Sequence, residues 1–171
     1  MQTPRILWFA LLMATFIYAA VGFVVAPKDL TIDPTILVVL GVLAIGTGTG
    51  AFVMGGMLRR QGYAGAQFEV EEVPDPNAET MFRDSPPTVR RFANPERVRS
   101  RLAALSFTPF ILELALSEAV AIFGLVAAML GAEPMTWLPF TALGAILIAI
   151  RFPTERRFVR ALERVYDARM P

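Results

Sequence analysis

Residues 105–131 form an apolar run that is long enough to cross a lipid bilayer and yet contains two carboxylates, Glu113 and Glu118. A charged side chain at mid-membrane depth costs at least about 2.5 kcal/mol even on the most lenient insertion scale. Carboxylates at such positions are therefore kept for a structural or functional reason. This stretch restricts the chain to a membrane environment and marks where its polar chemistry is expected.

Four apolar runs of about 20 residues are separated by polar segments. They are Ile6–Ala26, Thr35–Leu58, Leu105–Gly131 and Pro134–Ile150. Hydrophobic residues make up 55% of the 171 residues and charged residues only 18%, a balance outside the range of soluble domains. Because the runs are continuous rather than alternating, they predict helices and not the strands of a barrel. We therefore expect an all-α fold, a four-span transmembrane helical bundle with a long cytoplasmic loop and a C-terminal amphipathic helix.

The apolar runs divide the chain into four parts. Residues 1–58 are expected to form one transmembrane hairpin, and residues 105–152 a second. Residues 59–104 are charged and contain several prolines, so we expect an extended or partly ordered cytoplasmic loop that leads into the third span. Residues 153–171 keep helical spacing with apolar side chains on one face, which predicts an amphipathic helix lying on the membrane surface or on the loop.

Two short patterns predict where helices begin. Asp33-Pro34 and Asn94-Pro95 each combine a typical N-cap residue with a proline at the first helical position. Trp137 stands near the start of the fourth span, where tryptophan is typical of an anchor at the membrane interface.

The basic residues predict the orientation. All but two of the 16 basic residues, Arg5 and Lys28, lie between residues 59 and 104 or after residue 150. Because basic residues favour the cytoplasmic side, we expect the loop and both termini to be cytoplasmic, in a bacterial inner membrane. The first run also opens like a secretory signal peptide, but it continues past its alanines, and we expect it to remain as a span.

The absence of two residue types limits the kinds of chemical site that the chain can form. The chain has no cysteine and no histidine, which excludes disulfides, thiolate or imidazole metal ligands and histidine acid–base catalysis. We find no glycine-rich phosphate loop and no cluster of metal ligands, and we expect no cofactor and no metal. The 16 basic and 15 acidic residues give no overall attraction to nucleic acid.

Small residues form stripes on the second and third spans. They recur every three or four residues, at Gly41, Ala44, Gly48, Ala51 and Gly55, and at Ser117, Ala121, Gly124 and Ala128. Stripes of this kind allow neighbouring membrane helices to approach closely. We expect Gly41, Gly48, Gly55 and Gly124 to pack helices together.

Glu118 lies near the middle of the third span, with Glu113 nearer the cytoplasm. The second span runs in the opposite direction and brings residues 46–50, GTGTG, to a similar depth, so we expect Glu118 to face that helix. The spans contain no arginine, lysine or histidine at that depth. The carboxyl is therefore either protonated and hydrogen-bonded between helices or bound to a cation. The side chains expected to assist it are Glu113, Ser117, Thr47 and Thr49.

The segment from Glu118 to Leu125, EAVAIFGL, resembles the outer-helix motif of the ATP synthase rotor proteolipid, subunit c. In that motif a glutamate is followed by a small residue and, six positions on, by the glycine of an aromatic-Gly-Leu triplet. The 46–50 stretch is similar to the inner-helix glycine repeat of that family. The resemblance implies that Glu118 matches the carboxylate that carries a proton or a sodium ion. In the family a short turn joins the two helices, whereas residues 59–104 separate them here.

These observations favour two functions. The first is a small, non-catalytic subunit or accessory protein of a larger inner-membrane complex, with lipid and other membrane subunits or further copies as partners. The second is a proton- or sodium-coupling element with Glu118 as the carrier. An enzyme acting on lipid is a third possibility, but apart from arginines the chain shows no set of residues that would supply a nucleophile, a base and a phosphate-binding group.

Overall fold

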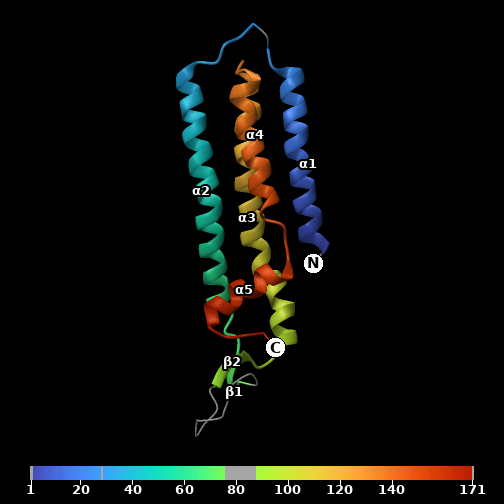
Figure 1. Cartoon of the computed structure of the whole chain (residues 1–171), viewed down its shortest axis with the longest axis vertical. Coiled ribbons are helices and arrows are strands. Elements are labelled where there is room, and N and C mark those ends of the chain that lie inside the picture. The colour runs from blue at the N-terminus through green and yellow to red at the C-terminus, as the bar shows by residue number, and fades with distance from the viewer. Residues whose placement is uncertain (1, 28, 76–87, 171) are drawn as a thin grey trace. The chain divides into compact units, whose positions relative to one another are not determined.

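We describe residues 2–27, 29–75 and 88–170 of a computed structural model; the part of the expected loop at 76–87 lies outside them. The described chain contains five helices and two strands (Figure 1). The helices are α1 (Gln2–Val25), α2 (Pro34–Ala64), α3 (Pro95–Met129), α4 (Pro134–Ala149) and α5 (Glu155–Tyr166). The strands are β1 (Val70–Pro74) and β2 (Thr88–Phe92).

Three helices in the described residues are long and apolar enough to cross a membrane: α1, α2 and α3, with 24, 31 and 35 residues. The helix α4 is also apolar, but it has only 16 residues. At 1.5 Å per residue it extends about 24 Å, less than the roughly 30 Å of a typical hydrocarbon core. The prediction of a helical fold is confirmed, and in the described residues three of the four expected spans have an apolar helix long enough to cross a membrane.

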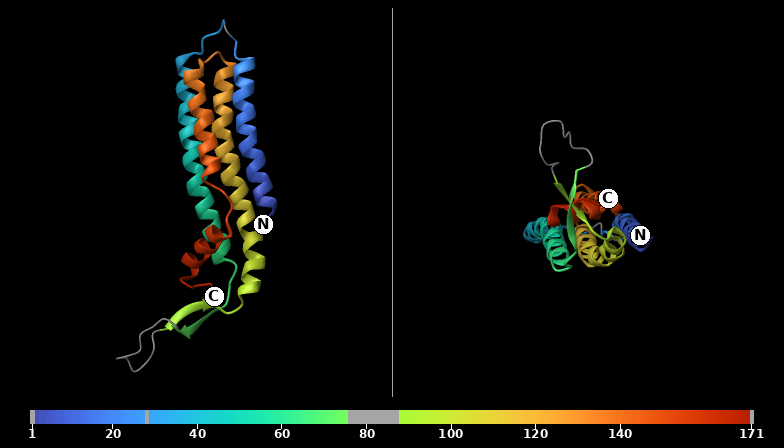
Figure 2. Two further views of the ribbon diagram at one scale, coloured as in Figure 1. Left: turned by 45° about the vertical axis from the view of Figure 1, so that its right-hand side comes forward. Right: turned by 90° about the horizontal axis from the view of Figure 1, so that it is seen from below.

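The chain folds as two compact units. Unit 1 consists of Met1–Gly56 and Pro109–Pro153, and unit 2 of Met57–Thr108 and Thr154–Pro171. In unit 1 the apolar parts of α1, α2, α3 and α4 run lengthwise beside one another (Figure 1 and Figure 2). Unit 2 contains the C-terminal end of α2, the N-terminal part of α3, both strands and α5. The expected loop and the expected C-terminal tail thus fold together.

Two glycines bring α3 and α4 into backbone contact. A Cβ atom at Gly124 would lie 2.9 Å from the Trp137 carbonyl oxygen, and one at Gly144 would lie 2.7 Å from the Ala121 nitrogen. Both distances are shorter than real Cβ contacts allow. Glycine is therefore required on each helix, as in other closely packed membrane helices.

Trp137 is fully buried, with 0% of its surface exposed. Gly22 of α1 lies against its ring, and the centroid of the Phe23 ring is 5.0 Å away. The expectation of an interfacial anchor is therefore wrong. The indole packs α4 against α1, and Gly22 makes room for it.

The predicted starts of α2 and α3 are confirmed. The Thr35 N–H donates to Oδ1 of Asp33 at 2.7 Å, and this hydrogen bond holds the pKa of the Asp33 carboxyl below its usual value. The Arg97 N–H donates to Oδ1 of Asn94 at 3.1 Å. In both cases the side chain satisfies a backbone donor that the first turn leaves open.

The expected loop is more ordered than predicted. The helix α2 continues beyond Leu58 to Ala64, and β1 pairs with β2 in an antiparallel hairpin. Val70 lies opposite Phe92, and Glu72 lies opposite Arg90. Because side chains alternate between the two faces of a strand, these two pairs lie on the same face, and each face of the hairpin combines apolar and charged residues. Two five-residue strands without an apolar–polar alternation give little signal in a sequence.

The core of unit 2 joins the hairpin to the C-terminal helix. The rings of Phe68, Phe92 and Tyr166 lie with their centroids 5.5–6.2 Å apart. On α5, Phe158 is 3% exposed and Leu162 is fully buried. The expectation of an amphipathic C-terminal helix is confirmed, and of its two expected positions the helix takes the one on the loop.

Candidate functional site

Arg151 directly follows the last turn of α4 and is only 1% exposed. Its Nη1 atom donates hydrogen bonds to the Leu147 carbonyl and to the Ser117 hydroxyl oxygen, each 2.7 Å long. A guanidinium is favoured at the C-terminal end of a helix because the last carbonyls carry partial negative charge. Arg151 therefore closes α4 and joins it to α3.

Glu113 lies one turn before Ser117 on α3 and is also 1% exposed. Its Oε2 atom is 3.8 Å from Nε of Arg151. The Ser117 hydroxyl, which accepts from Arg151, donates to the Glu113 carbonyl at 2.6 Å. Burying either charge alone would cost several kcal/mol, and the opposite charge offsets part of that cost. Glu113 and Arg151 therefore form a buried ion pair between α3 and the end of α4.

The helix α2 completes this site with Phe52 and Gly55. The Cζ atom of Arg151 is 4.3 Å from the centroid of the Phe52 ring, within the range of a cation–π interaction. Gly55 is buried, and a Cβ atom there would overlap the Glu113 carboxylate. Three helices thus meet at one polar group. We call it the charged core site and define it by Phe52, Gly55, Glu113, Ser117 and Arg151.

The variant Gly55→Ala should lower the stability of the bundle by about 1–3 kcal/mol, the usual cost of overpacking, because its methyl group would displace the Glu113 carboxylate. Gly56→Ala is the matched control, since a Cβ atom there would meet nothing within 4 Å. The control should be neutral or slightly stabilising, as alanine is the better helix former. Thermal unfolding of both variants in detergent measures the difference, and equal melting temperatures would contradict the close contact.

Glu118 belongs to a second polar pair. The Tyr18 hydroxyl of α1 donates to Oε1 of Glu118 at 2.7 Å, and both side chains are half-buried. The expectation that Glu118 faces α2 is wrong, because its partner comes from α1. Arg151 does reach Ser117, the neighbour of Glu118 in the sequence, but its charge is engaged by Glu113.

The other residues expected at the site lie on different surfaces. Thr47 is half-buried and Thr49 is exposed, and among the described residues neither hydroxyl bonds to a carboxylate. Gly48 lies beside Val120 and Leu147, whereas a Cβ atom at Gly41 would meet nothing within 4 Å. Gly124 packs against α4. The structure therefore brings together Glu113, Ser117 and Gly55 and leaves Thr47, Thr49 and Gly41 apart from them.

Two side chains of the polar pairs were not predicted from the sequence. Arg151 follows an apolar run, where an arginine is typical of the membrane interface, and only the fold shows that its side chain reaches back to α3. Tyr18 lies within an apolar run. Its hydroxyl could have indicated a polar partner, because a buried tyrosine hydroxyl usually finds a hydrogen-bond partner.

No family model, curated protein or solved structure matches this chain. The described residues contain no group of three or more histidine, cysteine, aspartate or glutamate side chains that could hold a metal ion.

The two pairs differ in their chemistry. Glu113 is compensated by a guanidinium and surrounded by three helices, an arrangement that fixes helices in place. Glu118 has a neutral hydroxyl as its hydrogen-bond partner within the described chain. The Glu118 pair thus joins α1 and α3 through a hydrogen bond to a neutral group.

Proposed function

We propose that this chain is a small, non-catalytic subunit that spans a bacterial inner membrane four times and docks to other subunits through unit 2. The observation that carries this proposal is the joint folding of the α2–α3 connection with the C-terminal segment. Tyr166 donates to the Tyr63 carbonyl at 2.7 Å, and the Arg169 N–H donates to the Arg90 carbonyl at 2.8 Å. A folded, charged unit attached to membrane helices offers a defined surface for a partner, which a loose linker does not.

The same observation supports four spans. The chain leaves unit 2 after Thr108, passes through α3 and α4, and re-enters unit 2 at Thr154. A segment that begins and ends in one folded unit crosses the membrane an even number of times. Since α3 is long enough to cross, α4 is the return span. Its 16 residues are accommodated if the bilayer thins locally, at a modest cost.

The charges support a cytoplasmic position for unit 2. Apart from Arg5, Lys28 and Arg151, all the basic residues belong to its two segments, and basic segments beside spans remain on the cytoplasmic side. With four spans, both termini lie on that side as well. Exposed arginines also attract anionic lipid headgroups and acidic protein surfaces.

Single-cysteine variants test this topology, because the chain has no cysteine of its own. The variants are Arg60→Cys and Arg156→Cys, at exposed positions of unit 2, and Asp29→Cys, at an exposed position between α1 and α2. A membrane-impermeant maleimide should label the two unit 2 positions in inside-out vesicles and Asp29→Cys in spheroplasts. Labelling of Arg60→Cys and Arg156→Cys from opposite sides would show that α4 does not cross.

Native mass spectrometry of the detergent-extracted protein tests the role as a subunit. We expect a complex with other polypeptides of fixed stoichiometry. A protein that remains a monomer under mild extraction would contradict this role. A ring of identical copies would instead favour the second candidate.

The second candidate is a proton- or sodium-coupling element, which the position of Glu118 supports. Its half-buried carboxyl lies at the middle of the apolar run of α3, and Tyr18 is its only hydrogen-bond partner among the described residues. The resemblance to the rotor proteolipid implies an ion-carrying carboxylate at the same residue. The exposed part of Glu118 would then face the surface along which the ion enters and leaves.

The variant Glu118→Gln should keep the fold, because its amide oxygen still accepts the Tyr18 hydrogen bond. A hydrogen bond between membrane helices is worth about 1 kcal/mol, so little change in melting temperature is expected.

The coupling role predicts that a hydrophobic carbodiimide labels the wild type at Glu118 and that sodium or alkaline pH blocks the labelling. A wild-type protein that is not labelled at Glu118, or labelling that neither condition alters, would leave Glu118 with a structural role only. Glu118→Gln serves as the unlabelled control.

A further inference from the structure

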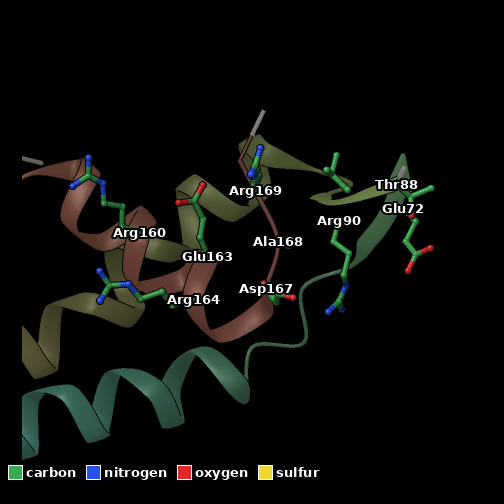
Figure 3. A pocket seen from close by; sticks show the side chains of 10 residues that line it. Glu72, Thr88, Arg90, Arg160, Glu163, Arg164, Asp167, Ala168 and Arg169 are labelled. Atoms are coloured by element: carbon green, nitrogen blue, oxygen red, sulfur yellow. The ribbon is translucent and has the colours of Figure 1, made fainter. Parts of the chain in front are cut away.

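Unit 2 contains an open cavity of about 650 Å³ between its hairpin, its C-terminal segment and α5. Figure 3 shows that the side chains around this hollow come from the hairpin and from the last part of the chain, which are distant in the sequence. Glu72 and Arg90 belong to the hairpin, Arg160, Glu163 and Arg164 to α5, and Arg169 to the C-terminal segment. The volume lies within the range of known small-molecule sites, and the charged lining disfavours a purely apolar ligand.

The walls of the cavity are fixed by the backbone. Asp167 adopts the left-handed conformation, with φ 49°, and ends α5. The chain then runs beside β2, where the Arg169 N–H donates to the Arg90 carbonyl at 2.8 Å and the Phe92 N–H to the Arg169 carbonyl at 3.4 Å. These contacts hold the C-terminal segment beside β2, with Arg160 and Arg164 on the α5 side of the opening and Arg90 on the hairpin side (Figure 3).

The charges around the opening favour an anion. The Glu163 carboxylate accepts the Met170 N–H at 3.0 Å and keeps its negative charge. Glu72 lies opposite Arg90 in the register of the hairpin, so these two charges offset each other. Three exposed arginines, Arg160, Arg164 and Arg169, then stand against Glu163 and Asp167, so the lining carries one more positive than negative charge. Guanidinium groups bind phosphate through paired, charge-assisted hydrogen bonds.

We propose that this cavity binds a phosphate-bearing ligand through the arginines of its lining, which are Arg90, Arg160, Arg164 and Arg169. The cavity is larger than a single phosphate needs and therefore also accepts the polar group that carries it. The phosphate belongs either to a soluble compound or to a lipid headgroup. Binding here does not depend on the docking role of unit 2.

The experiment compares a cavity variant with a charge-matched control in the full-length protein. The cavity variant is Arg160→Gln with Arg164→Gln, and the control is Arg156→Gln with Arg60→Gln, which lie outside the lining. All four positions are exposed, so both variants should fold, and circular dichroism checks this. If the cavity variant is misfolded, Arg90→Gln on the opposite wall takes its place.

Two probes distinguish the sources of the phosphate. Pyrophosphate is titrated calorimetrically into protein held in phosphatidylcholine nanodiscs, and retained phosphatidylglycerol is measured by native mass spectrometry. We expect the control to match the wild type and the cavity variant to lose about tenfold or more in one of the two assays, since a hydrogen bond to a charged group is worth about 1.5–3 kcal/mol. Loss of pyrophosphate binding identifies a soluble ligand, and loss of lipid alone identifies a headgroup. If neither probe binds, or if both variants bind equally well, the proposal is wrong.

Discussion

Replacing Arg151 by methionine should lower the stability of the bundle by about 3–5 kcal/mol, because it leaves the Glu113 carboxylate buried without its cation. Methionine keeps most of the side-chain volume, so the loss is that of charge and hydrogen bonds. The Leu147 carbonyl and the Ser117 hydroxyl lose their donor as well. Thermal and denaturant unfolding in detergent measure the effect.

The double variant Arg151→Met with Glu113→Gln separates this charge effect from general damage. Removing both charges eliminates the uncompensated carboxylate, so the double variant should be more stable than Arg151→Met alone. Arg156→Met, at an exposed position of α5, is the matched control and should change little. If the double variant is no more stable than the single one, an uncompensated Glu113 carboxylate is not the cause of the lost stability.

The variant Trp137→Ala should lower the stability by about 3 kcal/mol, at the low end of the 3–5 kcal/mol seen for large aromatic residues in cores. The low end is expected because lipid replaces water as the alternative surroundings, so the loss is mainly of packing against α1. Near-ultraviolet circular dichroism should also lose the signal of an immobilised indole.

Met135→Ala is the control for this prediction, since Met135 is 84% exposed on the same helix. It should leave the melting temperature nearly unchanged. If Trp137→Ala and Met135→Ala behave alike, Trp137 is not a core residue but the interfacial anchor that the sequence suggests.

The parts of the fold that depend on local chemistry were predictable. Continuous apolar runs predict membrane helices, and the Asp33-Pro34 and Asn94-Pro95 pairs predict their starts, because a cap acts within one turn. The β1–β2 hairpin was not predictable in the same way. Its pairing joins segments on either side of residue 80, and its stability comes from contacts of Phe92 with Phe68 and Tyr166.

The candidate site was predictable in part. Glu113, Glu118 and Ser117 stand out because polar groups in an apolar run need partners, and Gly55 stands out as a member of a stripe. The identity of the partners depends on which helix lies beside which, and the sequence alone does not determine this. Tyr18 and Arg151 are therefore visible as partners only once α1 and α4 are placed beside α3.

Arg151 stands just before Pro153, the last residue of unit 1. The guanidinium of Arg151 thus holds the final turn of α4 against α3 just before the chain leaves unit 1. Unwinding of α4 from its C-terminal end therefore has to break the hydrogen bonds of Arg151 to Leu147 and Ser117 and separate its charge from that of Glu113.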